Sequence, residues 1–243
     1  MIRVGTSGFS YQHWRGVFYP EDIPQRCWLE FYAEHFDCVE INSSFYHLPD
    51  KATFISWRKR TPEKFLFILK GSRYVSHIKR LQDCADAVKL FYERAHLLEE
   101  KLGPVLWQLP PRFVVDPARL ESFLSLLPTD TLPVLEFRDP GWFVQQIYQL
   151  LEARRAALCV HDMPKCNCPE IIIGPLLYLR FHGVGSKYSG NYNDETLRRY
   201  ADWAGKSGAR HIYAFFNNDS QGYAVGNAIT LREMLKQTWK CRR

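Results

Sequence analysis

A carboxylate and a guanidinium lie two residues apart near the middle of this chain, at Glu136 and Arg138. They fall in the stretch 133–142, whose apolar and polar residues alternate with the period of a β-strand. Asp139-Pro140 then indicates a helix start, because aspartate is a common N-cap and proline is tolerated at the first helical position. Such strand ends are where α/β proteins place their ligands, although a buried structural ion pair would give the same pattern.

The same arrangement recurs along the chain, because strand after strand has a polar or ionic residue near its carboxyl end. Burying this many charges is costly unless they are paired or hydrated, so the set predicts a ligand site. At the sixth expected strand the alternation does not decide between His161 and Asp162. The candidates are Glu40, Asn42, Lys70, Gln108, Glu136, Arg138, Asp162, Arg180, His182 and Asn217.

The cations in this set favour an anionic ligand. Arg138 and Arg180 are suited to holding a phosphate or carboxylate through paired hydrogen bonds, and Lys70 would stabilise negative charge that develops during a reaction. Loop residues extend the positive charge: Arg73, His77, Lys79, Arg80 and Lys187.

The remaining ionisable candidates could move protons. We assign catalytic roles to five residues: Glu40, Lys70, Glu136, Asp162 and His182. Which glutamate is the base stays open, since an apolar wall would raise its pKa and a neighbouring arginine would lower it.

Aromatic residues on the loops offer a second kind of contact. Phe9, Tyr11, Trp14 and Tyr74 could stack on a base or sugar ring, but for most of the loop aromatics we favour a small loop core. The predicted ligand-binding residues are Asn42, Tyr46, Gln108, Arg138, Arg180, Tyr188 and Asn217.

A divalent metal is the rival use of the carboxylates, with His161 and His182 as further ligands. The three cations among them argue against a carboxylate-rich cage, so we assign no metal ligand and leave the cofactor unknown. Cys166-Asn-Cys168 has a shorter gap than zinc sites commonly use, which favours a turn with two incidental thiols.

These side chains must be positioned by a repeated strand and helix pattern. Eight strands alternating with about seven helices predict one (β/α)8 TIM-barrel-like domain over 1–243, with a doubly wound open sheet as the alternative. The segment 163–175 is too short and proline-rich for a full helix, so the helix after strand six is expected to be short or missing. The expected strands are 2–7, 38–42, 65–70, 105–109, 133–138, 156–160, 176–182 and 211–217.

Composition limits the class of protein. The chain has 243 residues, 46% of them hydrophobic and 24% charged, which excludes a disordered chain and allows a large core. It has no apolar run near the ~20 residues of a membrane span and no signal-peptide pattern, so we expect a cytoplasmic protein without a membrane partner. Seven scattered cysteines are expected to be reduced.

Short motifs spread over the chain resemble the domain-of-unknown-function 72 family, also called YecE-like. They are GTSGFSY at 5–11, VEINSSFY at 39–46, WQLPP at 107–111, EFR at 136–138, RFHG at 180–183 and FNND at 216–219. The resemblance implies a TIM-barrel-like fold with these motifs at its mouth, and it implies no reaction. The fold is similar to those of xylose isomerase and the apurinic endonucleases, which use metals, but here Lys70, Arg138 and Arg180 lie among the carboxylates.

Three functions are therefore carried forward. The first is an enzyme of lyase, isomerase or hydrolase type that acts at the barrel mouth on a phosphorylated or other anionic small molecule. The second is a nucleic-acid-binding protein, with a metal-dependent phosphodiester-cleaving nuclease as its catalytic form. The third is a barrel without catalysis that serves as a scaffold.

Overall fold

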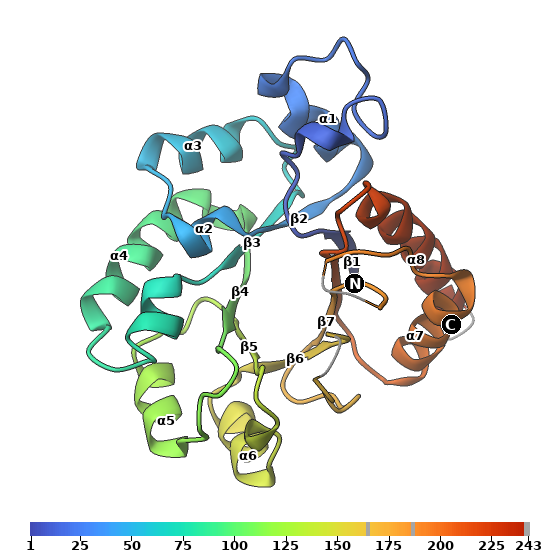
Figure 1. Ribbon diagram of the computed structural model, residues 1–243. Coiled ribbons are helices and arrows are strands. Elements are labelled where there is room, and N and C mark those ends of the chain that lie inside the picture. Colours follow the sequence, from blue (N-terminus) through green and yellow to red (C-terminus); the bar gives the residue numbers. More distant parts are fainter. Residues whose placement is uncertain (164–165, 186–187, 241–243) are drawn as a thin grey trace.

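Eight parallel strands form a ring with helices around it in the computed structural model, which describes residues 1–163, 166–185 and 188–240 (Figure 1). The order of paired strands is β1-β8-β7-β6-β5-β4-β3-β2. This confirms the predicted TIM-barrel-like fold. The strands are β1 (Ile2–Thr6), β2 (Cys38–Ile41), β3 (Leu66–Lys70), β4 (Leu102–Gln108), β5 (Pro133–Glu136), β6 (Ala157–His161), β7 (Leu177–Phe181) and β8 (Ile212–Phe216).

Helices follow most of the strands and cover the outside of the ring (Figure 1). Two of them begin at residue types that commonly cap helices: Asp116 accepts a hydrogen bond from Arg119 N at the start of α5, and Asn193 accepts one from Thr196 N before α7. The α-helices are α1 (Trp28–His35), α2 (Ser43–Tyr46), α3 (Lys51–Lys59), α4 (Ala85–Ala95), α5 (Pro117–Ser125), α6 (Gln145–Ala153), α7 (Asp194–Lys206) and α8 (Tyr223–Lys240).

The first and last strands of the pairing order meet at the mouth. Ser7 forms an isolated parallel bridge with Glu40, and Gly8 N donates to the carbonyl of Glu40 at 2.7 Å. Gly5 allows the close approach below this bridge, because a Cβ atom there would lie 2.6 Å from the Cys38 carbonyl oxygen. The ring is therefore nearly closed, and its seam ends at a predicted site residue.

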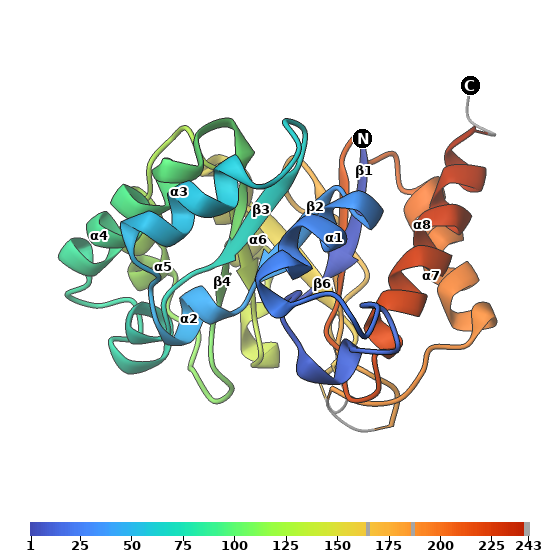
Figure 2. The same ribbon diagram turned by 90° about the horizontal axis from the view of Figure 1, so that it is seen from above.

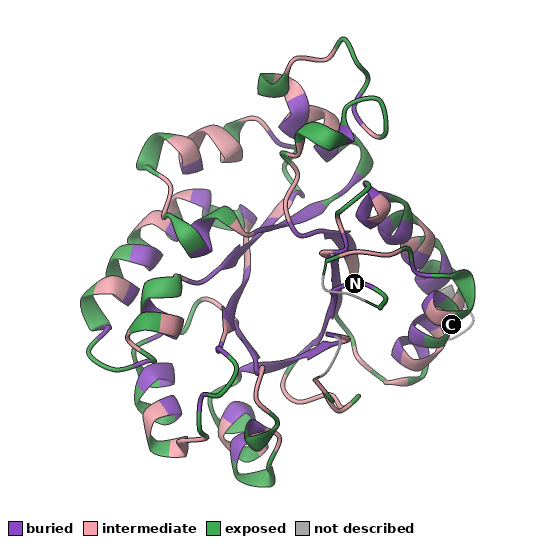
Figure 3. Cartoon of the chain, in the orientation of Figure 1, coloured by how far each residue is buried: buried purple, intermediate pink, exposed green. Residues whose placement is uncertain are grey.

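Alternation along the strands divides the core in two. One set of buried side chains fills the inside of the ring, including Ile68, Leu106, Val134, Tyr178 and Phe215. The other, larger set lies between strands and helices. Figure 3 shows the strands as an almost continuous buried ring. Polar residues at the strand ends thus stand above an apolar floor.

The loops after the strands gather at one end of the barrel, opposite the N-terminus (Figure 2). The first of these loops has the small aromatic core expected from the sequence: Trp14 and Tyr19 are buried, and Tyr19 stacks on Trp28 with ring centroids 4.6 Å apart. Phe9 and Tyr11 pack against that core. Tyr46, Tyr74 and Tyr188 are exposed instead.

Two elements differ from what the local sequence signals indicate. Gly103-Pro104 does not end a long helix but lies inside β4, because α4 ends at Ala95 and a 3-10 turn, His96–Lys101, follows it. Ser43–Tyr46 forms one helical turn rather than a loop. Between β6 and β7 the described residues 166–175 contain neither helix nor strand, as expected for a short or missing helix, and residues 164–165 lie outside the described ranges.

Within the described ranges no helix is both long enough and apolar enough to cross a membrane. The six cysteines among those residues form no disulfide.

Candidate functional site

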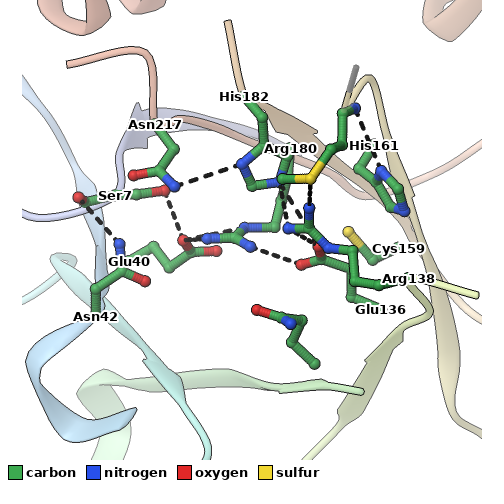
Figure 4. A network of polar contacts seen from close by, with 12 residues as sticks. Ser7, Glu40, Asn42, Glu136, Arg138, Cys159, His161, Arg180, His182 and Asn217 are labelled. Atoms are coloured by element: carbon green, nitrogen blue, oxygen red, sulfur yellow. Dashed lines mark hydrogen bonds and ion pairs between the residues drawn. The ribbon is translucent and has the colours of Figure 1, made fainter. Parts of the chain in front are cut away.

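Glu40 and Arg180 meet in the centre of the barrel, from β2 and β7 (Figure 4). Arg180 donates through Nε and Nη2 to Glu40 Oε1, at 3.1 and 2.6 Å. Ser7 Oγ donates to the same oxygen at 2.6 Å, and Tyr178 OH donates to Oε2 at 2.7 Å. Both carboxylate oxygens of Glu40 therefore have donors within the protein.

Glu136, from β5, joins this pair to a second arginine. Arg180 Nη1 donates to Glu136 Oε2 at 2.6 Å, and Arg138 pairs with Oε1. Burial alone would raise the pKa of Glu136, but Arg138 and then Arg180 hold it well below its ordinary value. Two glutamates and two arginines thus form a charge-balanced, desolvated chain of ion pairs across the barrel.

His182 lies at the upper end of that chain. Arg138 Nη2 is 2.9 Å from His182 Nε2, and because arginine only donates, Nε2 must be the unprotonated nitrogen. Nδ1 then carries the proton, so Asn217, 3.4 Å away, would turn its carbonyl oxygen toward the ring. Burial, followed by Arg180, lowers the pKa of His182 well below its ordinary value, which keeps the imidazole neutral.

Lys70 ends β3 beside this network and is only 8% exposed. Its Nζ lies 4.1 Å from the centre of the Phe45 ring, a cation–π distance. Among the described residues, no acceptor or carboxylate lies within bonding distance of Nζ. Burial, and next the charge of Arg180, lower the pKa of Lys70 from 10.5 to about 7.

His77 is one of the predicted loop cations, and the structure argues against that charge. Burial and then Lys70 lower its pKa to about 4, so the ring is neutral near pH 7. Ser76 Oγ, 2.9 Å from His77 Nδ1, also donates to the Ser72 carbonyl, and Gln108 Nε2 is 3.5 Å from His77 Nε2. These contacts fit a proton on Nδ1 and a lone pair on Nε2.

The ambiguous pair on β6 is separated by the fold. His161 is the inward residue, and its Nε2 is 2.8 Å from the carbonyl of Phe137. Asp162 faces the loop after β7, where it accepts from His182 N at 2.7 Å and from Tyr192 OH. Burial raises the pKa of Asp162 to about 6. Because these contacts tie Asp162 to the loop, its position suits loop anchoring better than proton transfer.

The remaining predicted residues lie around the rim. Asn42 Nδ2 donates to the Ser7 carbonyl at 3.3 Å, and its buried Oδ1 has no donor among the described residues. Tyr46 is 77% exposed and packs edge-on against Phe45. Tyr188 stands edge-on to His182, with ring centroids 5.8 Å apart, and Lys187 lies outside the described residues. The rim is thus partly open, whereas the glutamates and Arg180 are covered.

Several contact residues were not among the sequence candidates. Tyr178 shares a strand face with Arg180, so the alternation could have found it. Ser7 follows the first strand within a family motif. Met163, whose sulfur accepts from Arg138 Nη1, gave no signal because a methionine in a loop has no characteristic pattern.

Within the described part of the chain, no group of three or more histidine, cysteine or acidic side chains is placed to hold a metal ion. A cavity of about 730 Å³ lies outside the barrel between the segment 81–86 and α5. It contains none of the predicted site residues.

The sequence matches known proteins over nearly its full length. A family model described as "Protein of unknown function DUF72" matches residues 3–242. The UPF0759 protein YunF of Bacillus subtilis is 26% identical, covering 97% of this chain and 95% of the relative. The UPF0759 protein YecE of Escherichia coli K12 is 32% identical over 60% of this chain and 51% of its own length.

Solved structures give the same result. A DUF72 family protein from Thermotoga maritima superposes with a TM-score of 0.89 at 28% identity, covering 97% of this chain and 99% of the other. A xylose isomerase domain protein from Alicyclobacillus acidocaldarius superposes with a TM-score of 0.53 at 14% identity, covering 99% of each chain. The second likeness is one of fold alone.

Proposed function

Because the chain belongs to the DUF72 family, whose description assigns no function, we propose its activity from the barrel mouth itself. The protein is an enzyme that binds a phosphorylated or other anionic small molecule at this mouth and acts on it by acid/base chemistry. The observation that carries this proposal is the surplus of cationic donors beside the balanced ion-pair chain.

The surplus lies on Lys70 and Arg138. Lys70, whose pKa is about 7, adds a positive charge when it is protonated, in a set where two glutamates already balance two arginines. Among the described residues, Arg138 Nη1 contacts only the weakly accepting sulfur of Met163, and the buried Nε has no acceptor. An anion placed here would satisfy donors that are otherwise costly to bury.

Arg180 receives a different role from the one the sequence suggested. All three of its nitrogens donate to Glu40 or Glu136, and the residue is only 1% exposed. Arg180 therefore holds the two glutamates in place, and Arg138 is the residue that binds the anion. Since the oxygens of both glutamates are already engaged by arginine, serine and tyrosine donors, proton transfer is best assigned to Lys70 and the neutral His182.

Anion binding can be tested by thermal unfolding with inorganic phosphate, glycerol 3-phosphate and citrate. A ligand that binds the folded state raises Tm in proportion to the logarithm of its concentration. We expect at least one of these anions to raise Tm, the shift to vanish in Arg138→Gln, and a partial shift to return in Arg138→Lys.

Arg210→Gln is the matched control, because Arg210 is exposed at the opposite end of the barrel. Each variant is compared with its own ligand-free Tm, which removes the effect of altered stability. Equal shifts in the wild type and Arg138→Gln would place the anion elsewhere and refute the proposed site.

A second candidate rests on the rim. Tyr46 and Tyr74 are exposed, and Arg73 and Arg80 are exposed on the loop after β3. Exposed aromatic rings beside cations are the elements that hold single-stranded nucleic acid by stacking and backbone contacts. Salt dependence of binding separates this candidate from a small-molecule site.

A further inference from the structure

Two lysines are buried among the residues that the structure describes, and their surroundings differ. Lys101 is 5% exposed, and its Nζ donates to the carbonyls of Arg58 and Thr61 at 2.6 and 2.7 Å and to Thr61 Oγ1 at 3.2 Å. Three acceptors satisfy the three protons of its ammonium group. Lys101 is therefore a structural cation. It is the reference for a buried lysine whose ammonium protons all have acceptors.

Lys70 has none of these acceptors. Its Nζ lies over the Phe45 ring, and the charges that act on its pKa are those of Arg180, Glu136, Glu40 and Arg138. Burying an ammonium without an oxygen acceptor is unfavourable, and the cation–π contact with Phe45 offsets that cost only in part. Desolvation together with neighbouring cations is the usual way of making a lysine nucleophilic near neutral pH.

A neutral proton acceptor lies on the same aromatic ring. His77 packs edge-on against Phe45 with ring centroids 5.0 Å apart, and its Nε2 is the unprotonated nitrogen. Phe45 therefore separates a lysine amine from an imidazole, at the end of β3 and beside the donors of Arg138. The arrangement places an amine nucleophile beside a proposed anion site, with a neutral imidazole on the far side of the aromatic ring.

We propose that Lys70 forms an imine with the carbonyl carbon of an anionic aldehyde or ketone, a step that rests on the proposed anion site at Arg138. The neutral Nζ attacks the carbonyl carbon and gives a carbinolamine. The C–O bond then breaks, and the oxygen leaves as water with the two protons that the amine loses, which solvent water carries from nitrogen to oxygen. Uptake of one proton from solvent gives the iminium, and addition of water reverses the sequence.

The imine can be trapped on the wild-type chain. Dihydroxyacetone phosphate, pyruvate and glyoxylate serve as anionic probes and dihydroxyacetone as the neutral one, each with cyanoborohydride at neutral pH. Intact mass and peptide mapping then locate the reduced adduct. We expect at least one anionic probe to modify Lys70 at least tenfold faster than Lys101 or the exposed Lys89, and inorganic phosphate to slow that reaction.

Cyanate gives a measurement that needs no fitted substrate, because it adds to neutral amines. At neutral pH we expect carbamylation of Lys70 to be at least tenfold faster than that of Lys89. The imine proposal is overturned if none of the anionic carbonyls modifies Lys70 selectively. It is equally overturned if cyanate modifies Lys70 no faster than Lys89.

The two proposals fail in different ways. An anion that raises Tm through Arg138 without any adduct on Lys70 would leave the anion site standing and remove the imine. Selective modification of Lys70 that is equally fast with dihydroxyacetone and its phosphate, and insensitive to inorganic phosphate, would keep the nucleophile and remove the anion site.

Discussion

At the scale of single residues, the charge on Lys70 should be measurable as a stability effect. The pKa of Lys70 is about 7 in the folded chain and 10.5 ordinarily, so between these values the unfolded chain binds more protons. Stability contributed by this group therefore rises with pH across that window and is lowest below pH 7. Lys70→Met removes the penalty, whose upper limit is about 5 kcal/mol.

We expect Lys70→Met to unfold at a higher urea concentration than the wild type at about pH 6, and the difference to shrink toward about pH 10. Lys89→Met is the control, because Lys89 is exposed and its replacement should change stability by less than about 0.5 kcal/mol. A gain that stays constant with pH would mean that Lys70 is charged in the folded state.

Replacing Glu136 should reduce stability, in contrast to replacing Lys70, since its loss leaves Arg138 and Arg180 without their shared counter-charge. Removing one partner of a buried ion pair is strongly destabilising, so Glu136→Gln should lower the free energy of unfolding by about 3–5 kcal/mol. Urea unfolding measures this loss. In the exposed pair Arg199–Glu170, Glu170→Gln should cost less than about 1 kcal/mol. Similar losses in both variants would contradict a buried, desolvated network.

The sequence predicts which residues point inward, but it does not predict which of them find hydrogen-bond and ion-pair partners within the protein. Period-two alternation places Glu40, Glu136 and Arg180 on the inner face of their strands. Their pairing joins positions up to 140 residues apart, and it depends on the size of the ring. For that reason Arg180 looked like a ligand clamp in the sequence and is enclosed by glutamates in the structure.

At the scale of elements, the seam between β1 and β2 depends on the absence of a side chain at Gly5. A Cβ there would lie 2.6 Å from the Cys38 carbonyl oxygen and 3.1 Å from Tyr32 OH. Gly5→Ala should force the two strands apart and lower stability by about 1–3 kcal/mol. Because Ser7 and Glu40 form the bridge above this contact, anion binding should weaken as well.

Gly226→Ala is the matched glycine control. Gly226 is exposed within α8, and a methyl group added there would meet nothing within 4 Å, so alanine should raise stability by up to about 1 kcal/mol. Thermal and urea unfolding of both variants test the pair. A neutral Gly5→Ala would show that the seam has room to relax.

Element boundaries were least predictable where tertiary pairing overrides local signals. Gly103-Pro104 is a typical helix stop followed by a loop, yet it lies in β4. The pairing of β3 with β4 shifts register between Phe67 and Leu69, and this irregularity accommodates a proline that cannot donate. The single turn Ser43–Tyr46 is too short to show a helical period in sequence.

At the scale of the whole molecule, the sequence predicts the fold because the pattern is repeated. Eight alternating strand segments in this length leave few architectures other than a barrel, and the long loops after strands indicate one working end. The pattern does not indicate which ligand binds at that end of the barrel. The rim that surrounds Lys70 and Arg138 has both exposed aromatic rings and exposed cations. A binding measurement therefore has to separate a small anionic ligand from a nucleic acid.

A nucleic-acid role for the rim makes a quantitative prediction. Each phosphate contact to a single strand contributes about −0.7 to the slope of log affinity against log salt. Loss of Arg73 and Arg80 in a double glutamine variant should reduce that slope by about 1.4 for a short single-stranded DNA measured by fluorescence anisotropy. Changes at Lys206 and Arg210, which lie at the opposite end of the barrel, should leave it unaltered. Equal slopes in all variants, or no binding at low salt, would leave the small anion as the occupant, since the buried Nε of Arg138 has no acceptor among the described residues and Lys70 lies beside it.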